Sequence, residues 1–144
     1  MSKALGGVIS PNPYKEIGWG EVAVGEHAEA RRWFGNTKQF LSFHWHGETF
    51  TLPKGATHLL ASEHCQNQAY SLGKHLAFQC HVEMTADMVK VWRETGRDEV
   101  ESAISSKGVQ PVAEIQSRLT ERISALNQVA ASIYSVWIQG LKDS

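Results

Sequence analysis

The segment LAFQCHVE, residues 76–83, joins an apolar run to a histidine and, two residues later, a glutamate. The apolar run predicts a short buried strand, and Thr85 directly afterwards opens a helical pattern. A strand that ends in His-x-Glu places an imidazole and a carboxylate at the carboxyl edge of a sheet, where open α/β folds keep their sites. His81 and Glu83 are therefore candidates for the base and the orienting acid of a catalytic triad, which also needs a nucleophile. Without further context, such a pair is more often an ordinary polar strand end.

The composition is that of one globular domain, which we expect to span residues 1–144. Hydrophobic residues make up 42% of the chain and charged residues 20%, and the five Trp and five Phe can supply a sizeable core. The net charge of -1 gives no electrostatic reason to expect a nucleic acid or an anionic membrane surface as partner. Cys65 and Cys80 occur in a chain without a recognisable signal peptide or membrane-spanning run. We therefore expect free thiols and a cytoplasmic protein.

Short strands and turns are predicted through the first part of the chain. A strand at residues 8–10 should end at Pro11 and Pro13, because two prolines favour an extended turn. Period-two alternation predicts a further strand at residues 16–24, and residues 40–53 predict a hairpin that turns at Gly47. Three apolar segments, residues 58–63, 68–72 and 76–82, are spaced as in a meander.

Helices are predicted at residues 26–34, between Thr85 and Gly96, and at residues 97–106. From Pro111, apolar residues recur every three or four positions for about eight turns, which predicts one long amphipathic helix lying on the domain. The sequence contains no internal repeat or low-complexity tract.

Five motifs follow one another along the chain: GW at 18–19, HWHGETF at 44–50 with LP at 52–53, LAS at 60–62, CQNQAY at 65–70 and FQCHVE at 78–83. In this order and spacing they resemble the class I glutamine amidotransferases, most of all stand-alone domains related to the glutaminase part of GMP synthase. The family's last motif is usually Phe-Gln-Phe-His-Pro-Glu, from which the chain departs at Cys80 and Val82. The resemblance implies an α/β fold of the flavodoxin-like, three-layer type. This chain would be its C-terminal part, with short mixed and antiparallel strands followed by C-terminal helices.

The resemblance also implies roles for individual residues. His81 would be the triad base, which deprotonates a cysteine for attack on the side-chain amide of glutamine. Glu83 would hold the imidazole in the productive tautomer. Trp45 and His46 match the segment that borders the glutamine pocket in these enzymes, although His46 fits a structural turn histidine equally well.

The nucleophile of the family is missing from this sequence. It sits in a Gly-x-Cys-x-Gly-x-Gln elbow, whereas Cys65 lies in EHCQN and Cys80 adjoins His81 on the predicted strand. Residues 1–7 resemble the family's helix just after the elbow. We therefore expect the C-terminal portion of an amidotransferase, inactive alone, whose exposed Phe43, Trp45, Leu76 and Phe78 favour a homo-oligomer or pairing with an elbow-bearing chain.

Two other classes of function are consistent with these residues. One is a non-catalytic binding or interaction module derived from the same fold. The other is a small metalloprotein, suggested by the pairs His44 with His46, His64 with Cys65, and Cys80 with His81. These pairs lack the short CxxC or HxxxH spacing that makes a zinc site specific, so we expect no metal and no cofactor.

Overall fold

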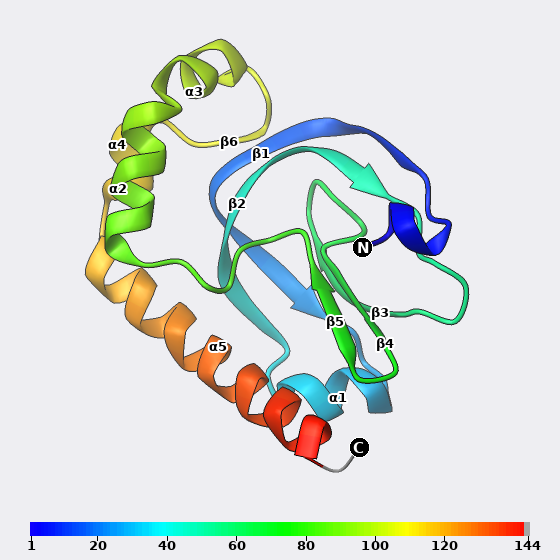
Figure 1. Cartoon of the computed structure of the whole chain (residues 1–144). Coiled ribbons are helices and arrows are strands. Elements are labelled where there is room, and N and C mark those ends of the chain that lie inside the picture. The colour runs from blue at the N-terminus through cyan, green and yellow to red at the C-terminus, as the bar shows by residue number, and fades with distance from the viewer. Residues whose placement is uncertain (143–144) are drawn as a thin grey trace.

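The sheet is organised around one long ribbon of two antiparallel strands. In the computed structural model, which describes residues 1–142, β1 (Ile9–Val24) pairs with β2 (Gln39–Phe50) from one end to the other. The strand order is β2-β1-β3-β4-β5, and β6 (Gly108–Val109) pairs in parallel with β1. Figure 1 shows that the ribbon curls strongly, with helices along one side.

Strands β3 (Thr57–Ser62), β4 (Ala69–Leu72) and β5 (His75–Phe78) form the expected antiparallel meander. The turn before it contains Gly55, whose φ of 81° is a left-handed conformation that favours glycine. The predicted α/β class, with antiparallel strands followed by C-terminal helices, is confirmed.

The short helices begin and end close to the predicted positions. Helix α1 (Ala28–Phe34) ends at Gly35. Helix α2 (Ala86–Thr95) starts at Thr85, whose hydroxyl accepts a hydrogen bond from the backbone N–H of Met88, and it ends at Gly96. Helix α3 (Arg97–Ala103) follows directly, and a 3₁₀ turn, η1 (Lys3–Leu5), lies near the N-terminus.

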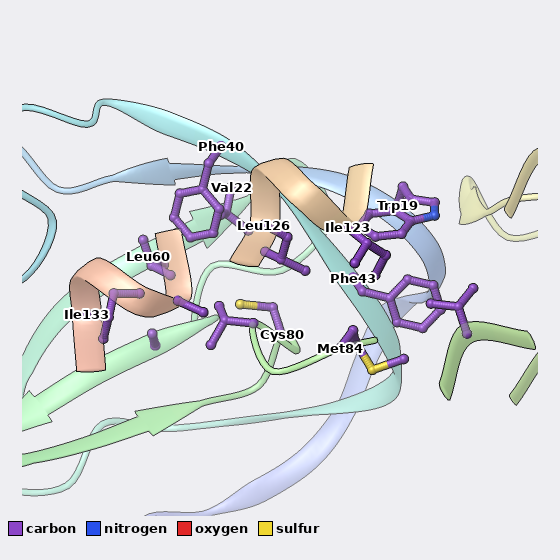
Figure 2. Close-up of a cluster of buried hydrophobic side chains, with 14 of the residues drawn as sticks. Trp19, Val22, Phe40, Phe43, Leu60, Cys80, Met84, Ile123, Leu126 and Ile133 are labelled. Atoms are coloured by element: carbon purple, nitrogen blue, oxygen red, sulfur yellow. The ribbon is translucent and has the colours of Figure 1, made fainter. Parts of the chain in front are cut away.

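The core lies between the sheet and the inner face of helix α5 (Leu119–Lys142). That face repeats at helical spacing through the buried residues Ile123, Leu126, Ala130 and Ile133. Figure 2 shows part of this face packed with side chains of the strands and with Cys80 and Met84. Each fully buried aliphatic side chain contributes about 1.5–3 kcal/mol. The core therefore anchors the segment that carries His81 and Glu83.

Two predicted strand boundaries are wrong. Pro11 and Pro13 lie inside β1, at an interruption of the β1–β2 register between Pro11 and Glu16. Prolines are tolerated there because the ladder hydrogen bonds are already broken. The side-chain amide of Asn12 bridges this bulge to the carbonyl oxygens of Tyr14, at 2.6 Å, and His64, at 2.8 Å.

The predicted hairpin at Gly47 is also wrong, because β2 runs on to Phe50 while its partner β1 extends equally far. Gly47 does not have the positive φ of a tight turn. Strand β5, in contrast, stops at Phe78. His81 therefore follows a bend and forms an isolated bridge with Phe43, rather than ending the strand as predicted.

The single helix predicted after Pro111 is two helices, α4 (Val112–Gln116) and α5. Ser117 is extended, and Arg118 has a left-handed φ of 51°, which breaks the helical hydrogen-bond pattern. Within residues 1–142, no helix combines the length and the apolar character needed to cross a membrane.

Candidate active site around His81 and Glu83

His81 and Glu83 form a hydrogen-bonded pair at the surface. Nδ1 of His81 lies 2.7 Å from Oε1 of Glu83, and the two side chains are 26% and 47% exposed. A carboxylate only accepts, so Nδ1 carries the proton and Nε2 of the neutral ring keeps its lone pair. This is the arrangement of a general base with its orienting acid.

The backbone around the pair explains why both side chains reach solvent. Cys80, Val82 and Met84 alternate with them and are buried in the core. The N–H of His81 donates to the carbonyl oxygen of Phe43 at 2.8 Å, which fixes the segment to β2. Burial of one set of alternate residues therefore turns the other set outward.

Glu83 is held in its ionised form. The hydrogen bond from His81 lowers the pKa of the Glu83 carboxyl, and hydrogen bonds from backbone N–H groups lower it further, against an opposing effect of burial. An ionised Glu83 favours the protonated imidazole that forms when a base takes up a proton.

Two tryptophans build a wall beside His81. The ring of Trp92, from α2, meets the imidazole edge to face with centroids 4.9 Å apart, and Trp45 packs against Trp92 at 5.9 Å. Nε1 of Trp45 donates to Glu99 at 2.9 Å. Gly96 leaves the space for this ring, since a Cβ there would lie 2.2 Å from Cζ2 of Trp45. Trp45 therefore contacts Trp92, and Trp92 contacts His81 of the dyad.

His46 is not brought to the dyad. It follows Trp45 on β2, and neighbouring residues of a strand point to opposite faces. Its Nε2 lies 3.0 Å from Oε2 of Glu16, and its Nδ1 lies 3.0 Å from the carbonyl oxygen of Glu48. The alternation along β2 was already a signal that Trp45 and His46 cannot face the same pocket.

Both thiols are buried and held in the protonated form. Burial raises the pKa of Cys80 to about 12, and the side chain belongs to the core in Figure 2. Burial also raises the pKa of Cys65, whose Sγ lies 3.4 Å from Oγ1 of Thr49. Because the thiolate is the reactive form, neither cysteine has the environment of a nucleophile.

Sequence reasoning missed Trp92 and Tyr134 as neighbours of the dyad. Trp92 lies in the helix predicted between Thr85 and Gly96, and nothing local distinguishes a core tryptophan from one that packs on a histidine. Burial raises the pKa of the Tyr134 hydroxyl on α5, and the charge of Glu83 raises it further. The contact between Trp92 and His81 forms only when α2 packs against the segment that carries the dyad.

No family model matches the chain. It is 29% identical over 119 residues to the glutamine amidotransferase-like protein YfeJ of Salmonella typhimurium, an alignment covering 81% of this chain and 50% of that protein. A crystal structure of a glutamine amido transferase from Methylobacillus flagellatus superimposes with a TM-score of 0.92 and 40% identity, over 96% of this chain and 58% of the other. A glutamine amidotransferase from Thermotoga maritima gives a TM-score of 0.80 and 26% identity, over 95% and 57%.

The chain spans about half the length of the curated relative and somewhat more than half of the two solved structures. The similarity in sequence and the similarity in structure are both to amidotransferase-like proteins, in agreement with the resemblance of the motifs at residues 18–83 to those of class I enzymes. In sequence and in fold, this chain is similar to glutamine amidotransferase-like proteins.

Proposed function

We propose that this chain carries the base and the orienting acid of a glutaminase site, in a domain that hydrolyses the side-chain amide of glutamine and passes on ammonia. The observation that supports this most is the 2.7 Å hydrogen bond between His81 and Glu83, on a segment resembling the family's catalytic motif. The amidotransferase relatives support the same substrate class.

The dyad suits both proton transfers of this reaction. With Glu83 holding Nδ1–H, Nε2 of His81 takes the proton of a cysteine thiol, and the thiolate attacks the amide carbon. The imidazolium then gives that proton to the departing nitrogen, which leaves as ammonia. In the second half, His81 takes a proton from water, and the hydroxide adds to the thioester carbon. The C–S bond then breaks, glutamate leaves, and the released thiolate takes back the proton from His81.

The thiol itself comes, in this proposal, from residues outside this sequence. Cys65 and Cys80 are buried, and their raised pKa values keep them protonated. We therefore expect no ammonia release from the 144 residues alone.

Trp45 and Trp92 form one wall of the glutamine pocket in this proposal. The ring of Trp92 packs on His81, Trp45 packs on Trp92, and both would present apolar surface to the aliphatic part of a glutamine side chain. His46 lies on the other face of β2 and is not part of this pocket.

A second candidate is a non-catalytic binding module that keeps the pocket and associates with another chain. The burial of both thiols favours it as well. The two candidates differ in whether the dyad works once a cysteine is supplied.

A hybrid protein tests this difference. Residues of this chain would replace the corresponding part of the Methylobacillus flagellatus amidotransferase, to which it is 40% identical. We expect the hybrid to release ammonia from glutamine. His81→Gln should lower kcat by at least about a thousandfold, and Glu83→Gln by a smaller factor. His75→Gln, an exposed histidine on β5, is the matched control and should leave kcat unchanged.

Three results would count against the proposal. Ammonia release by the chain alone would mean that one of its own thiols is the nucleophile. Activity of the hybrid that survives His81→Gln would remove the dyad from the reaction. A folded hybrid without activity would favour the binding module.

A further inference from the structure

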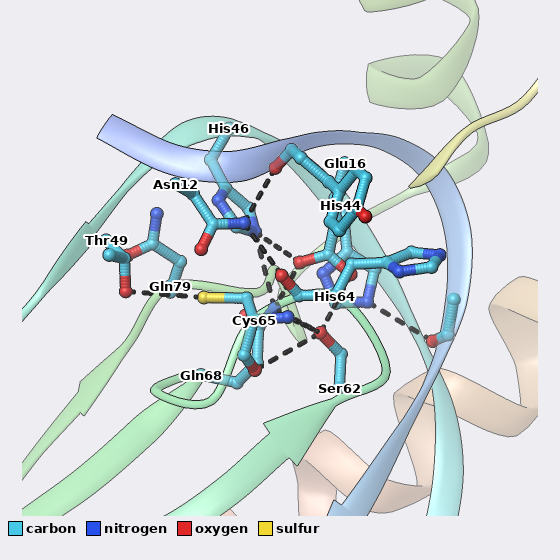
Figure 3. Close-up of polar contacts among 12 residues, drawn as sticks. Asn12, Glu16, His44, His46, Thr49, Ser62, His64, Cys65, Gln68 and Gln79 are labelled. Atoms are coloured by element: carbon cyan, nitrogen blue, oxygen red, sulfur yellow. Dashed lines mark hydrogen bonds and ion pairs between the residues drawn. The ribbon is translucent and has the colours of Figure 1, made fainter. Parts of the chain in front are cut away.

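A second polar cluster lies on the face of β2 opposite to Trp45. A carboxylate oxygen of Glu16 and one ring nitrogen each of His44 and His46 all lie within 4.8 Å of one another. The pairing explains the meeting: Glu16 is directly opposite His46 in the β1–β2 ladder, and His44 is two residues away on the same face of β2. Figure 3 shows the three side chains gathered between the two strands.

Each imidazole is anchored through one nitrogen to a backbone carbonyl. Nδ1 of His46 lies 3.0 Å from the carbonyl oxygen of Glu48, and Nε2 of His44 lies 3.2 Å from that of Gly20. Because a carbonyl only accepts, these nitrogens carry the protons. The bare nitrogens are then Nε2 of His46 and Nδ1 of His44.

The bare nitrogen of His44 has no partner. His44 is 1% exposed, and its Nδ1 is buried without a hydrogen bond among residues 1–142. A buried ring nitrogen left unsatisfied destabilises the fold unless a ligand contacts it.

The carboxylate of Glu16 is held rigidly beside these nitrogens. Its Oε1 accepts from the hydroxyl of Ser62 at 2.8 Å, and its Oε2 accepts from the amide of Gln68 at 2.7 Å. Oε2 also lies 3.0 Å from Nε2 of His46. Two lone pairs facing each other at this distance repel, so the contact is favourable when either a proton on Nε2 of His46 or a metal ion lies between the two atoms. The side-chain nitrogen of Gln68 also lies 3.3 Å from the same Nε2.

We propose that Glu16, His44 and His46 bind one divalent transition-metal ion, with Zn²⁺ the best match. Two imidazole nitrogens and one carboxylate oxygen are a ligand set that zinc uses, and three protein ligands leave a fourth position open. Hydrogen bonds from the far ring nitrogens to carbonyls, and from Ser62 and Gln68 to the carboxylate, are the supporting contacts that metal ligands commonly have.

The open position has room for water or a small ligand. Glu16 and His44 line a cavity of about 640 Å³, together with Ser62, His64 and Lys107. This cavity gives an ion access to the cluster. The site is separate from the His81–Glu83 dyad and goes beyond the proposed glutaminase function.

The competing explanation is a buried hydrogen bond from Nε2–H of His46 to the carboxylate of Glu16, which binds no metal. To separate the two, the full chain is stripped with a chelator and titrated with Co²⁺ and then Zn²⁺. We expect one Co²⁺ per chain, with the visible spectrum of a tetrahedral nitrogen and oxygen site, and its displacement by Zn²⁺. A sulfur-to-cobalt charge-transfer band would place the ion on Cys65 and overturn the proposal, as would a folded chain that binds no ion.

The variants His44→Gln and His46→Gln, checked for folding by circular dichroism, should each weaken Zn²⁺ binding by at least about tenfold. His75→Gln is the control for adventitious binding by an exposed imidazole and should bind as the wild type does. Unchanged affinity in a folded His46→Gln variant would also overturn the proposal. If neither variant folds, the stoichiometry and the spectrum of the wild-type chain decide.

Discussion

At the scale of single residues, both clusters depend on glycines that leave room for a neighbouring ring. A Cβ on Gly20 would lie 3.0 Å from Cδ2 and Nε2 of His44, and one on Gly96 would overlap Trp45. The rings of His44 and Trp45 therefore depend on the absence of a side chain at Gly20 and Gly96, as well as on their hydrogen bonds.

We expect the charge of Glu83 to contribute to the stability of the fold. Its pKa in the folded chain is below the ordinary value of 4.5, mainly because His81 donates a hydrogen bond to it. A lowered folded pKa stabilises the fold above pH 4.5, and this contribution is lost as the pH falls through the folded pKa. Glu83→Gln should lower the free energy of unfolding at about pH 7 by less than about 1 kcal/mol, because solvent screens this half-exposed group.

Urea denaturation at about pH 7 and about pH 3 measures the difference in the free energy of unfolding between the wild type and Glu83→Gln. This difference should disappear at the lower pH. Glu101→Gln, at an exposed position of α3, is the control and should match the wild type at both values. A difference that persists in acid would mean that Glu83 stabilises the fold by something other than its charge.

At the scale of elements, strand β2 separates the two sites. Its odd-numbered residue Trp45 faces the dyad, and its even-numbered residues His44 and His46 face Glu16 on β1. Because β2 is continuous to Phe50, both faces are held by one ladder, and a change of register would disrupt both sites.

The break between α4 and α5 stores backbone strain at Arg118, whose φ is 51°. Left-handed conformations cost residues with a Cβ about 1–2 kcal/mol, whereas glycine adopts them freely. Arg118→Gly should therefore be more stable than Arg118→Ala by about 1 kcal/mol, and both variants equally lose the ion pair with Glu121.

Thermal unfolding of Arg118→Gly and Arg118→Ala measures which of the two variants is more stable. Ser117 is the control position, because its φ of -63° suits any residue. There the glycine variant should be no more stable than the alanine variant. Equal stability of Arg118→Gly and Arg118→Ala would argue against strain at the break.

At the scale of the whole molecule, the exposed apolar surface differs from the one predicted. Phe43 is fully buried, so that part of the expectation is wrong, while Leu76 and Phe78 remain half-buried. The largest exposed apolar side chains on α5 share one helical face and are between 39% and 47% exposed: Tyr134, Trp137, Ile138 and Leu141. Tyr134 and Trp137 also line a cavity of about 260 Å³ with Leu76 and Phe78.

Such a surface favours self-association of the isolated chain. We expect sedimentation velocity to show species larger than a monomer, and Ile138→Lys to shift the distribution toward the monomer. Val91→Lys places the same charge at an exposed apolar position of α2 and should leave the distribution unchanged. A wild-type chain that is monomeric at all concentrations would contradict this prediction.

The sequence by itself determined what depends on residues a few positions apart. The cap at Thr85, the stops at Gly35 and Gly96, the meander and the His-x-Glu spacing all follow from short-range periodicity and local hydrogen bonding. The motif order also indicated the family resemblance that the comparisons support. These signals are local, so neighbouring residues suffice to read them.

Only the tertiary structure decided what depends on pairing between distant segments. Strand β2 continues beyond Gly47 because β1 is long enough to pair with it there. Trp92 contacts His81 because α2 folds back over the sheet. The meeting of Glu16 with His46 depends on the register between two strands 30 residues apart in sequence. Register is set by the fit of whole faces in the core, which the period of a single strand does not specify.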